Sequence, residues 1–354
     1  MKAAVWYGHK DIRVMDVPEP CVLPGHVKIK VAYAGICGTD RHEYVGPNFI
    51  PAKKPHRLTG KMAPLIMGHE FSGIIVEVAD DVKDWKVGDR VTASGNIFCG
   101  ECRWCREGRY NICEKLGFNG ISRDGGFAEY VVVPQYQLFK IPDNLSLKKA
   151  VLAEPLACGF HAAKLLGDDL TGQKVVIVGA GMIGISCLIA AISRGSGNIL
   201  VIGRGNSKEQ IIRKLWADYA ATKFVDVVEY TKNWSDGEMA DIVFECVGTE
   251  QTLDLSLKLS RNASKIMVMG VYENMPRIDM NMFQEGERIL MSSQAYVDEI
   301  GSALKYLTNN NFPIENIITS EISLDRIVED GFEELIKNSG NHIKIILKIS
   351  DMEE

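Results

Sequence analysis

Two patterns of hydrophobic and polar residues divide this chain. Residues 1–147 alternate short runs rich in β-forming residues with turns of Gly, Pro and Asp. The clearest runs are 27–31, 73–78 and 127–133. Together they predict a mainly β domain over 1–147, antiparallel or barrel-like.

From residue 148 onward, mostly apolar strands alternate with segments of helix length. The predicted strands are 174–178, 198–202, 241–246 and 265–270. Strands that helices cover on both faces are apolar throughout, and a series of them forms a parallel, doubly wound sheet. The sequence therefore predicts an α/β protein whose second domain covers 148–300.

The last segment, 301–354, carries an amphipathic helical pattern over 324–336 and a terminal strand over 342–347. Because that strand alternates apolar and polar residues, it does not suit a parallel core, and we expect it to return to the first domain. The uncharged run 175–193 is long enough to span a membrane. Its glycines favour a buried strand, a turn and a buried helix instead.

Composition excludes several classes of protein. The 354 residues suffice for two domains, and 46% hydrophobic with 24% charged residues is typical of a folded globular chain. The net charge of −6 and the lack of a basic tail argue against nucleic acid as a partner. Charged residues at Lys10, Asp11 and Arg13 precede any long apolar run, so neither a signal nor a transit peptide is expected. We expect a cytoplasmic protein with no membrane partner.

Four of the nine cysteines, Cys99, Cys102, Cys105 and Cys113, fall in one short stretch. The cytosol keeps thiols reduced, so clustered cysteines indicate a metal rather than disulfides. This spacing predicts a closed, tetrahedral zinc site that orders a loop. The alternatives are an iron–sulfur cluster, which the long gap before Cys113 fits less well, and four free thiols.

A Gly-x-Gly-x-x-Gly sequence follows the strand 174–178 and precedes a helical run. Its glycines permit a tight turn, approach to a pyrophosphate and close packing of helix on strand. We therefore predict a dinucleotide site rather than a merely structural turn. Its residues are Gly179, Gly181, Met182, Ile183 and Gly184, and we also assign Cys246 and Val247 to it.

The end of the second strand indicates which dinucleotide. An NAD site usually has Asp or Glu here for the ribose 2′-hydroxyl, whereas an NADP site removes that charge and offers Arg. This chain has Gly203 and Arg204, with Lys208 following and no carboxylate before Glu209. Gly203 leaves room and the two basic residues attract a 2′-phosphate, which favours NADP. The alternative is a solvated basic turn.

A third set of residues is dispersed: Cys37, His69, Glu70 and Glu154. Each can be ordinary packing or turn chemistry. Together they offer one soft, one borderline and one or two hard ligands, the mixture that a catalytic zinc uses.

With these motifs the chain resembles the zinc-dependent medium-chain alcohol dehydrogenases over nearly its whole length. The motifs that carry the resemblance, in the family's order, are 68–70, the four-cysteine stretch, 125–130, 154–155 and the glycine sequence 179–184. The stretches 49–51, 54–56 and 63–64 look most like the branch of 2,3-butanediol dehydrogenases. Sugar-alcohol, polyol-phosphate and threonine dehydrogenases share most of the other motifs.

The resemblance implies a GroES-like catalytic domain over 1–147 with a zinc lobe at 99–113, a Rossmann domain over 148–300, and a return to the catalytic domain over 301–354. It assigns Cys37, His69 and Glu154 as ligands of a catalytic zinc, in addition to the structural zinc. Glu70 is then a neighbouring carboxylate that exchanges onto the metal or holds its water, and relatives differ on which glutamate is the ligand. Thr39 takes the alcohol proton and His42 passes it towards solvent.

The implied function is hydride transfer between a small secondary alcohol or its ketone and NAD(P), with NADP favoured. A diol of the 2,3-butanediol type is the expected substrate. The resemblance also implies a homodimer or homotetramer, with the apolar run 289–291 covered by a second subunit. A zinc-free reductase of this fold lacks Cys37, His69 and Glu154, and a non-enzymatic zinc protein has no need of Thr39 and His42.

Overall fold

The computed structural model describes residues 1–47, 49–308 and 313–352. The chain forms two compact units, one of Met1–Glu154 with Ile300–Glu354 and the other of Pro155–Glu299. The first change of unit thus falls between Glu154 and Pro155, a few residues after the boundary expected at 148.

The first unit is built from β-sheets around one apolar core. A three-stranded sheet has the order β2-β1-β4, and a seven-stranded sheet has the order β10-β6-β5-β3-β18-β17, with β9 paired to β3. Its strands in the N-terminal segment are β1 (Lys2–Gly8), β2 (Asp11–Asp16), β3 (His26–Gly35), β4 (Leu65–Ile66), β5 (Glu70–Val78), β6 (Arg90–Ala93), β7 (Asn96–Ile97), β8 (Gly117–Phe118), β9 (Tyr130–Pro134) and β10 (Leu138–Lys140). Trp6, Phe71 and Phe127 are buried at the centre of this core. The β-rich N-terminal domain predicted from the sequence is confirmed.

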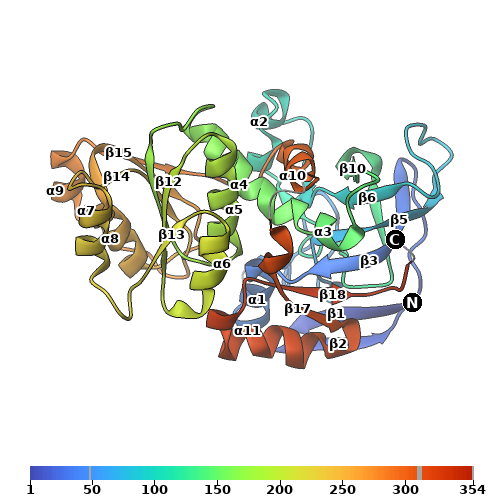
Figure 1. The fold of residues 1–354 in the computed structure, drawn as a ribbon. Helices are drawn as coiled ribbons and strands as arrows, with labels where there is room; N and C mark the ends of the chain where they lie inside the picture. Colours follow the sequence, from blue (N-terminus) through green and yellow to red (C-terminus); the bar gives the residue numbers. More distant parts are fainter. Residues whose placement is uncertain (48, 309–312, 353–354) are drawn as a thin grey trace. The chain divides into compact units, whose positions relative to one another are not determined.

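Short helices connect these strands (Figure 1). They are α1 (Gly38–Val45), α2 (Arg103–Arg106) and α3 (Leu147–Ala150), with 3₁₀ turns at Tyr110–Ile112 and Gln135–Gln137. The long helix α4 (Ala153–Leu166) starts in the first unit and continues in the second.

The C-terminal segment adds two strands to the seven-stranded sheet. Its elements are α10 (Glu299–Leu307), a 3₁₀ turn at Ile314–Ile317, β17 (Ile318–Ser323), α11 (Glu334–Lys337), a 3₁₀ turn at Ser339–Asn341 and β18 (Lys344–Lys348). β18 pairs antiparallel with β3 but parallel with β17. The argument from alternation was therefore wrong, since Lys344 to Leu347 are all buried and one pairing is parallel.

The amphipathic pattern over 324–336 also needs correction. It forms a 3₁₀ turn at Leu324–Arg326, a π-helix at Ile327–Glu333 and then α11, rather than one α-helix. Its apolar face is buried as predicted, through residues such as Phe332. A Cβ atom at Gly331 would lie only 2.7 Å from the side chain of Ile36, the residue that follows β3. The wider turn of the π-helix therefore occurs where Gly331 packs closely against that side chain.

The second unit is a parallel sheet whose successive strands are mostly connected by helices along the chain (Figure 1). The strand order is β13-β12-β11-β14-β15-β16, and every neighbouring pair is parallel. The strands are β11 (Lys174–Val178), β12 (Asn198–Gly203), β13 (Asp218–Ala221), β14 (Ala240–Glu245), β15 (Ser260–Val268) and β16 (Ile289–Ser292). The helices are α5 (Met182–Ser193), α6 (Glu209–Lys214), α7 (Val227–Trp234), α8 (Glu250–Leu259) and α9 (Met280–Glu285), with a 3₁₀ turn at Asn206–Lys208. The predicted doubly wound sheet is confirmed.

The uncharged run 175–193 is a strand, a glycine turn and a helix, as predicted, because it spans β11 and α5. Within residues 1–47, 49–308 and 313–352, the structure contains no helix of the length and apolarity that crossing a membrane requires.

Candidate metal centres and cofactor site

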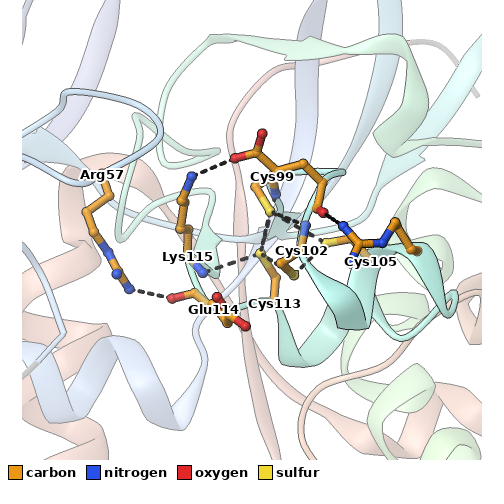
Figure 2. A network of polar contacts seen from close by, with 9 residues as sticks. Arg57, Cys99, Cys102, Cys105, Cys113, Glu114 and Lys115 are labelled. Carbon is orange, nitrogen blue, oxygen red and sulfur yellow. Dashed lines mark hydrogen bonds and ion pairs between the residues drawn. The ribbon is translucent and has the colours of Figure 1, made fainter.

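The four clustered cysteines converge on one point (Figure 2). Their Sγ atoms are separated by 3.5 Å between Cys102 and Cys105 and between Cys99 and Cys113, by 3.9 Å between Cys99 and Cys105, and by 4.0 Å between Cys102 and Cys113. Zinc–sulfur bonds of about 2.3 Å in a tetrahedron put the sulfurs about 3.8 Å apart. The cluster therefore fits a closed four-thiolate zinc site.

Backbone N–H groups point at these sulfurs. Cys99 donates to Cys113, Cys102 donates to Cys99 and Lys115 donates to Cys113, each at 3.3 Å. Backbone hydrogen bonds from Glu114 and Cys105 lower the pKa of Cys102 to about 6, whereas burial raises the pKa of Cys105 to about 12. Four thiolates at neutral pH therefore require a bound cation, since the thiols alone do not all ionise.

The loop around this cluster is fastened from outside. Lys115 forms an ion pair with Glu101 at 2.7 Å, and Arg57 donates to the backbone carbonyl of Glu114 (Figure 2). The first contact lies within the cysteine loop, and the second links this loop to the segment around Arg57. Both contacts help to hold the loop in the conformation that brings the four sulfurs together.

A second cluster joins parts of the first unit that are distant in sequence. Cys37 follows β3 and is the N-cap residue of α1, whereas His69 and Glu70 lie at the start of β5. The antiparallel pairing of β3 with β5 places Gly35 opposite Glu70. One ligand atom each from Cys37, His69 and Glu70 lies within 4.8 Å of the others. This mixture of thiolate, imidazole and carboxylate suits zinc.

The Glu70 carboxylate is held by a buried lysine from β18. Nζ of Lys344 lies 2.7 Å from both Glu70 oxygens and 3.1 Å from the carbonyl oxygen of Ile36. Both side chains are 2% exposed or less. Burial lowers the pKa of Lys344, but the negative charges of Glu70, Cys37 and Glu154 together with the hydrogen bond to Glu70 leave that pKa above its usual value. The two groups form a buried ion pair, and a Cβ at Gly35 would overlap Glu70.

Asp40, in the first turn of α1, holds the other side of the cluster. Its Oδ2 accepts the N–H of Cys37 at 2.9 Å, and its Oδ1 lies 3.5 Å from Nδ1 of His69. Burial raises the pKa of Asp40 to about 6. Asp40 therefore holds the Cys37 backbone by a hydrogen bond and lies at ion-pair distance from the His69 ring, without a hydrogen bond between those two side chains.

The remaining residues implied by the resemblance lie in the same unit. Glu154 is buried in the first turn of α4, but within the described part of the chain it is not in the compact group of Cys37, His69 and Glu70. Thr39 and His42 are half-buried on α1, three positions apart, so they share one face of that helix.

The glycine sequence of the second unit adopts the expected turn between β11 and α5. Gly179 has φ +116, and a Cβ there would lie 2.8 Å from Val247 and 3.4 Å from Cys246. A Cβ at Gly184 would overlap the Gly179 carbonyl oxygen. Gly181 is the N-cap of α5 and faces open space. The turn thus leaves the helix N-terminus accessible, which fits a pyrophosphate there.

The loop that carries Val247 is fixed by Glu245, the buried last residue of β14. Its Oε1 accepts N–H groups from Val247 at 2.9 Å and from Gly248 at 3.0 Å. Its Oε2 accepts the Tyr272 hydroxyl at 2.9 Å. The loop after β14 is therefore held against the glycine turn through contacts with Gly179.

The two basic residues predicted to select NADP follow the end of β12. The Gly179 N–H donates to Ile202 at 2.9 Å, so this end adjoins the glycine turn. Arg204 is exposed and Lys208 half-buried, and burial lowers the pKa of Lys208 to about 8. The Tyr219 hydroxyl from β13 fills the space that a side chain at 203 would take. The expectation that Gly203 leaves room for a 2′-phosphate stays a prediction.

Sequence reasoning missed three residues around these sites: Asp40, Tyr219 and Lys344. The signal for Lys344 is a lysine that opens the apolar run 345–347, which is unusual for a buried strand. Asp40 had a weak signal three residues after Cys37. Tyr219 had none, because its place under Gly203 depends on strand pairing.

Comparisons with known proteins agree with this architecture. Residues 23–143 match the family described as alcohol dehydrogenase GroES-like domain, and residues 182–309 match the family described as zinc-binding dehydrogenase. The chain is 36% identical to (R,R)-butanediol dehydrogenase of Bacillus subtilis (strain 168), over 98% of this chain and 99% of that protein. It is 32% identical to a sorbitol dehydrogenase of Halalkalibacterium halodurans over 98% and 99%, and 34% identical to L-threonine 3-dehydrogenase of Pyrococcus horikoshii over 79% and 78%.

Solved structures give the same result. The crystal structure of 2R,3R-butanediol dehydrogenase from Bacillus subtilis superposes with a TM-score of 0.90 at 36% identity, covering 98% of this chain and 99% of that one. A chain from Sinorhizobium meliloti 1021 that is bound to NADP has a TM-score of 0.88 at 30% identity, covering 98% of each.

The chain therefore belongs to the zinc-dependent alcohol dehydrogenase family, with a GroES-like domain and a Rossmann domain. It is an oxidoreductase, and its relatives include butanediol, sorbitol and threonine dehydrogenases.

Proposed function

We propose that this enzyme transfers hydride between NADP and a small secondary alcohol, a vicinal diol of the 2,3-butanediol type, or its ketone. The observation that carries the reaction class is the convergence of Cys37, His69 and Glu70 within 4.8 Å, on segments that only the folded first unit brings together. The similarity to butanediol dehydrogenases over nearly the whole chain supports the substrate class.

The catalytic metal ligands are Cys37, His69 and Glu154 in this proposal. Glu70 does not serve as the resting third ligand, because Lys344 already engages both of its oxygens at 2.7 Å. Zinc held there supplies Lewis-acid chemistry, which eases deprotonation of an alcohol and polarises a carbonyl. The four-cysteine cluster has no open position for substrate, so its zinc is structural, and the enzyme holds two zinc ions per chain.

The protein's own groups move the proton. Thr39 accepts the hydroxyl proton of the alcohol, and His42, on the same face of α1, passes it towards solvent. In the reducing direction Thr39 returns the proton to the carbonyl oxygen. Asp40 keeps the His69 ring oriented throughout, from its place 3.5 Å from Nδ1.

The NADP preference rests on Arg204 and Lys208. Both stand after the end of β12, where no carboxylate precedes Glu209. With its pKa lowered to about 8, Lys208 is mostly cationic at pH 7 and loses its charge as the pH rises through 8. The ratio of NAD to NADP dissociation constants should therefore fall above pH 8, and Lys208→Met should remove that pH step.

A substrate panel tests the proposed reaction. Stereoisomers of 2,3-butanediol, sugar alcohols, polyol phosphates and L-threonine are assayed with NAD and with NADP, on enzyme whose zinc content has been measured. The highest kcat/KM for a butanediol isomer with NADP supports the proposal. A higher kcat/KM for sorbitol or threonine would show that the proposed substrate is wrong. A higher kcat/KM with NAD would show that Arg204 and Lys208 do not select the cofactor.

The sheet of the second unit leaves β16 at its edge, with Ile289 and Leu290 50% and 43% exposed. An exposed apolar edge strand pairs readily with another strand, so a second copy of the chain covers it in a dimer or tetramer. A monomer in light scattering at micromolar concentration contradicts this assembly.

All nine cysteines are free thiols in the structure. Reduced thiols and thiolate zinc sites persist in a reducing compartment, which supports a cytoplasmic location.

A further inference from the structure

We propose that Tyr219 is a specificity-determining residue for the cofactor, because it occupies the side-chain space of position 203 and fixes the turn that carries Arg204. This inference rests on the proposed NADP preference. Tyr219 is a positioning residue here, since it acts through the turn and not on the reacting atoms.

Strand pairing places Tyr219 under the end of β12. β13 runs parallel to β12, with Tyr219 opposite Val201 and Ala221 opposite Gly203. The tyrosine ring therefore extends two residues along the strand direction and reaches Gly203. The side chain is 4% exposed, so the sheet and its neighbours enclose it.

The fit between Tyr219 and Gly203 excludes any side chain at 203. A Cβ at Gly203 would overlap the Tyr219 hydroxyl oxygen and would lie 2.5 Å and 2.8 Å from two ring carbons. Real Cβ atoms do not approach other heavy atoms within 3.0 Å. The obstruction is a buried aromatic ring, which cannot swing aside as an exposed flexible chain does.

The hydroxyl also fastens the turn. It donates a hydrogen bond to the carbonyl oxygen of Gly205, two residues beyond Gly203. Arg204 lies between these two glycines, so the backbone on both sides of it rests against the phenol. The 203–205 turn thus presents Arg204 from a fixed backbone.

These contacts bear directly on cofactor choice. An NAD site of this fold places Asp or Glu near the end of this strand to bind the ribose 2′-hydroxyl. At position 203, Tyr219 takes the volume that such a carboxylate needs. A single Gly203→Asp change should therefore damage the turn instead of creating an NAD site, and the change needs a smaller residue at 219.

The steric part is tested first by thermal unfolding. Gly203→Ala is compared with Gly205→Ala, a matched control in the same turn, where an added Cβ meets nothing within 4 Å. We expect Gly203→Ala to lower Tm clearly and Gly205→Ala to change it little. Equal Tm values for the two variants would overturn the obstruction by Tyr219.

The specificity part is tested by dissociation constants for NAD and NADP, from titration of protein fluorescence, for five proteins: wild type, Gly203→Asp, Tyr219→Val, the double variant of these two changes, and Tyr219→Phe. Gly203→Asp alone should weaken both cofactors. The double variant should bind NAD at least about tenfold more tightly than Gly203→Asp, as expected for a hydrogen bond to a charged group. Tyr219→Phe, which keeps the ring, should weaken NADP about two- to tenfold.

The outcomes separate this inference from the proposed function. If Gly203→Asp alone binds NAD as tightly as the double variant, Tyr219 does not control the site. If Tyr219→Phe leaves NADP binding unchanged, the hydroxyl does not fix the turn. A third outcome is that the wild type binds NAD more tightly than NADP, while the double variant still binds NAD more tightly than Gly203→Asp. The proposed NADP preference is then wrong, but the conclusion that Tyr219 excludes a side chain at position 203 stands.

Discussion

The two candidate metal-binding clusters of this enzyme are built in opposite ways. The four cysteines lie within 99–113, one loop whose own backbone N–H groups point at the sulfurs. The second cluster takes Cys37 from the N-cap of α1, His69 and Glu70 from the start of β5 and the residue before it, and its supporting Lys344 from β18. The first site is formed by a single loop, whereas the second forms only when distant segments of the first unit fold together.

The charges around the two clusters differ as well. The cysteine cluster offers four like ligands at near-tetrahedral spacing, so a cation there is fully enclosed by thiolates. The second cluster mixes ligand types, and the buried ammonium of Lys344 beside it engages the Glu70 carboxylate. A closed site of four thiolates orders a loop, whereas a catalytic zinc uses three ligands of mixed type and keeps one position open.

The largest expected effect comes from removing a ligand of the mixed cluster. Cys37→Ser should lower turnover at least about a thousandfold, because zinc supplies several kcal/mol of barrier reduction. NADP binding should persist, since the glycine turn lies in the other unit. Zinc analysis should give one ion per chain in place of two. Near-normal turnover in zinc-depleted Cys37→Ser would contradict the assignment, and His69→Ala should behave alike.

The next effect concerns the buried pair of Glu70 and Lys344. Lys344→Met strands a buried carboxylate and should lower the free energy of unfolding by about 3 kcal/mol. Lys348→Met is the matched control on the same strand, where the exposed pair with Asp351 contributes little to stability. Both are measured by denaturant unfolding with zinc present.

The double variant Lys344→Met with Glu70→Gln sharpens this test. It should lose less stability than the sum of the single variants, because neither charge is then left unpaired. Strict additivity would show that the two side chains do not interact in solution.

A smaller effect is expected from Asp40, which contacts the mixed cluster without being a proposed ligand. Asp40→Asn should weaken zinc binding at that cluster about 10- to 100-fold, because it removes the negative charge 3.5 Å from the His69 ring, and loss of a supporting group behind a metal ligand usually has an effect of this size. Competition with a chelator measures this affinity. Zinc at the cysteine cluster should be retained equally in wild type and variant, and parallel loss of both ions would refute a local role.

The smallest effect on turnover should come from the cysteine cluster. Cys102→Ser should lower Tm and zinc content while leaving the turnover of the remaining folded enzyme nearly unchanged, because that zinc orders a loop. Cys21→Ser, at an exposed cysteine outside both clusters, is the control. A loss of turnover at unchanged Tm and zinc content would reverse the contrast between the two sites.

Much of the molecule followed from short-range pattern. The parallel strands, the glycine turn and the four-cysteine site could be predicted because their residues are close in sequence, and local geometry brings them together. The glycine turn between β11 and α5 has the conformation expected of it, down to the positive φ of Gly179. The segment 324–336 shows the limit, since its pattern gave the buried face but not the helical pitch.

Only the tertiary structure decided which residues come into contact when strands that are distant in sequence pair with one another. Lys344 reaches Glu70 because β18 pairs with β3, which in turn pairs with β5. Tyr219 fills the space at Gly203 because β13 pairs with β12 in one particular register. A sequence pattern reports whether a position is buried or exposed, but strand register decides which buried side chain it meets. For that reason the residue pattern did not show that Lys344 meets Glu70 or that the ring of Tyr219 lies beside Gly203.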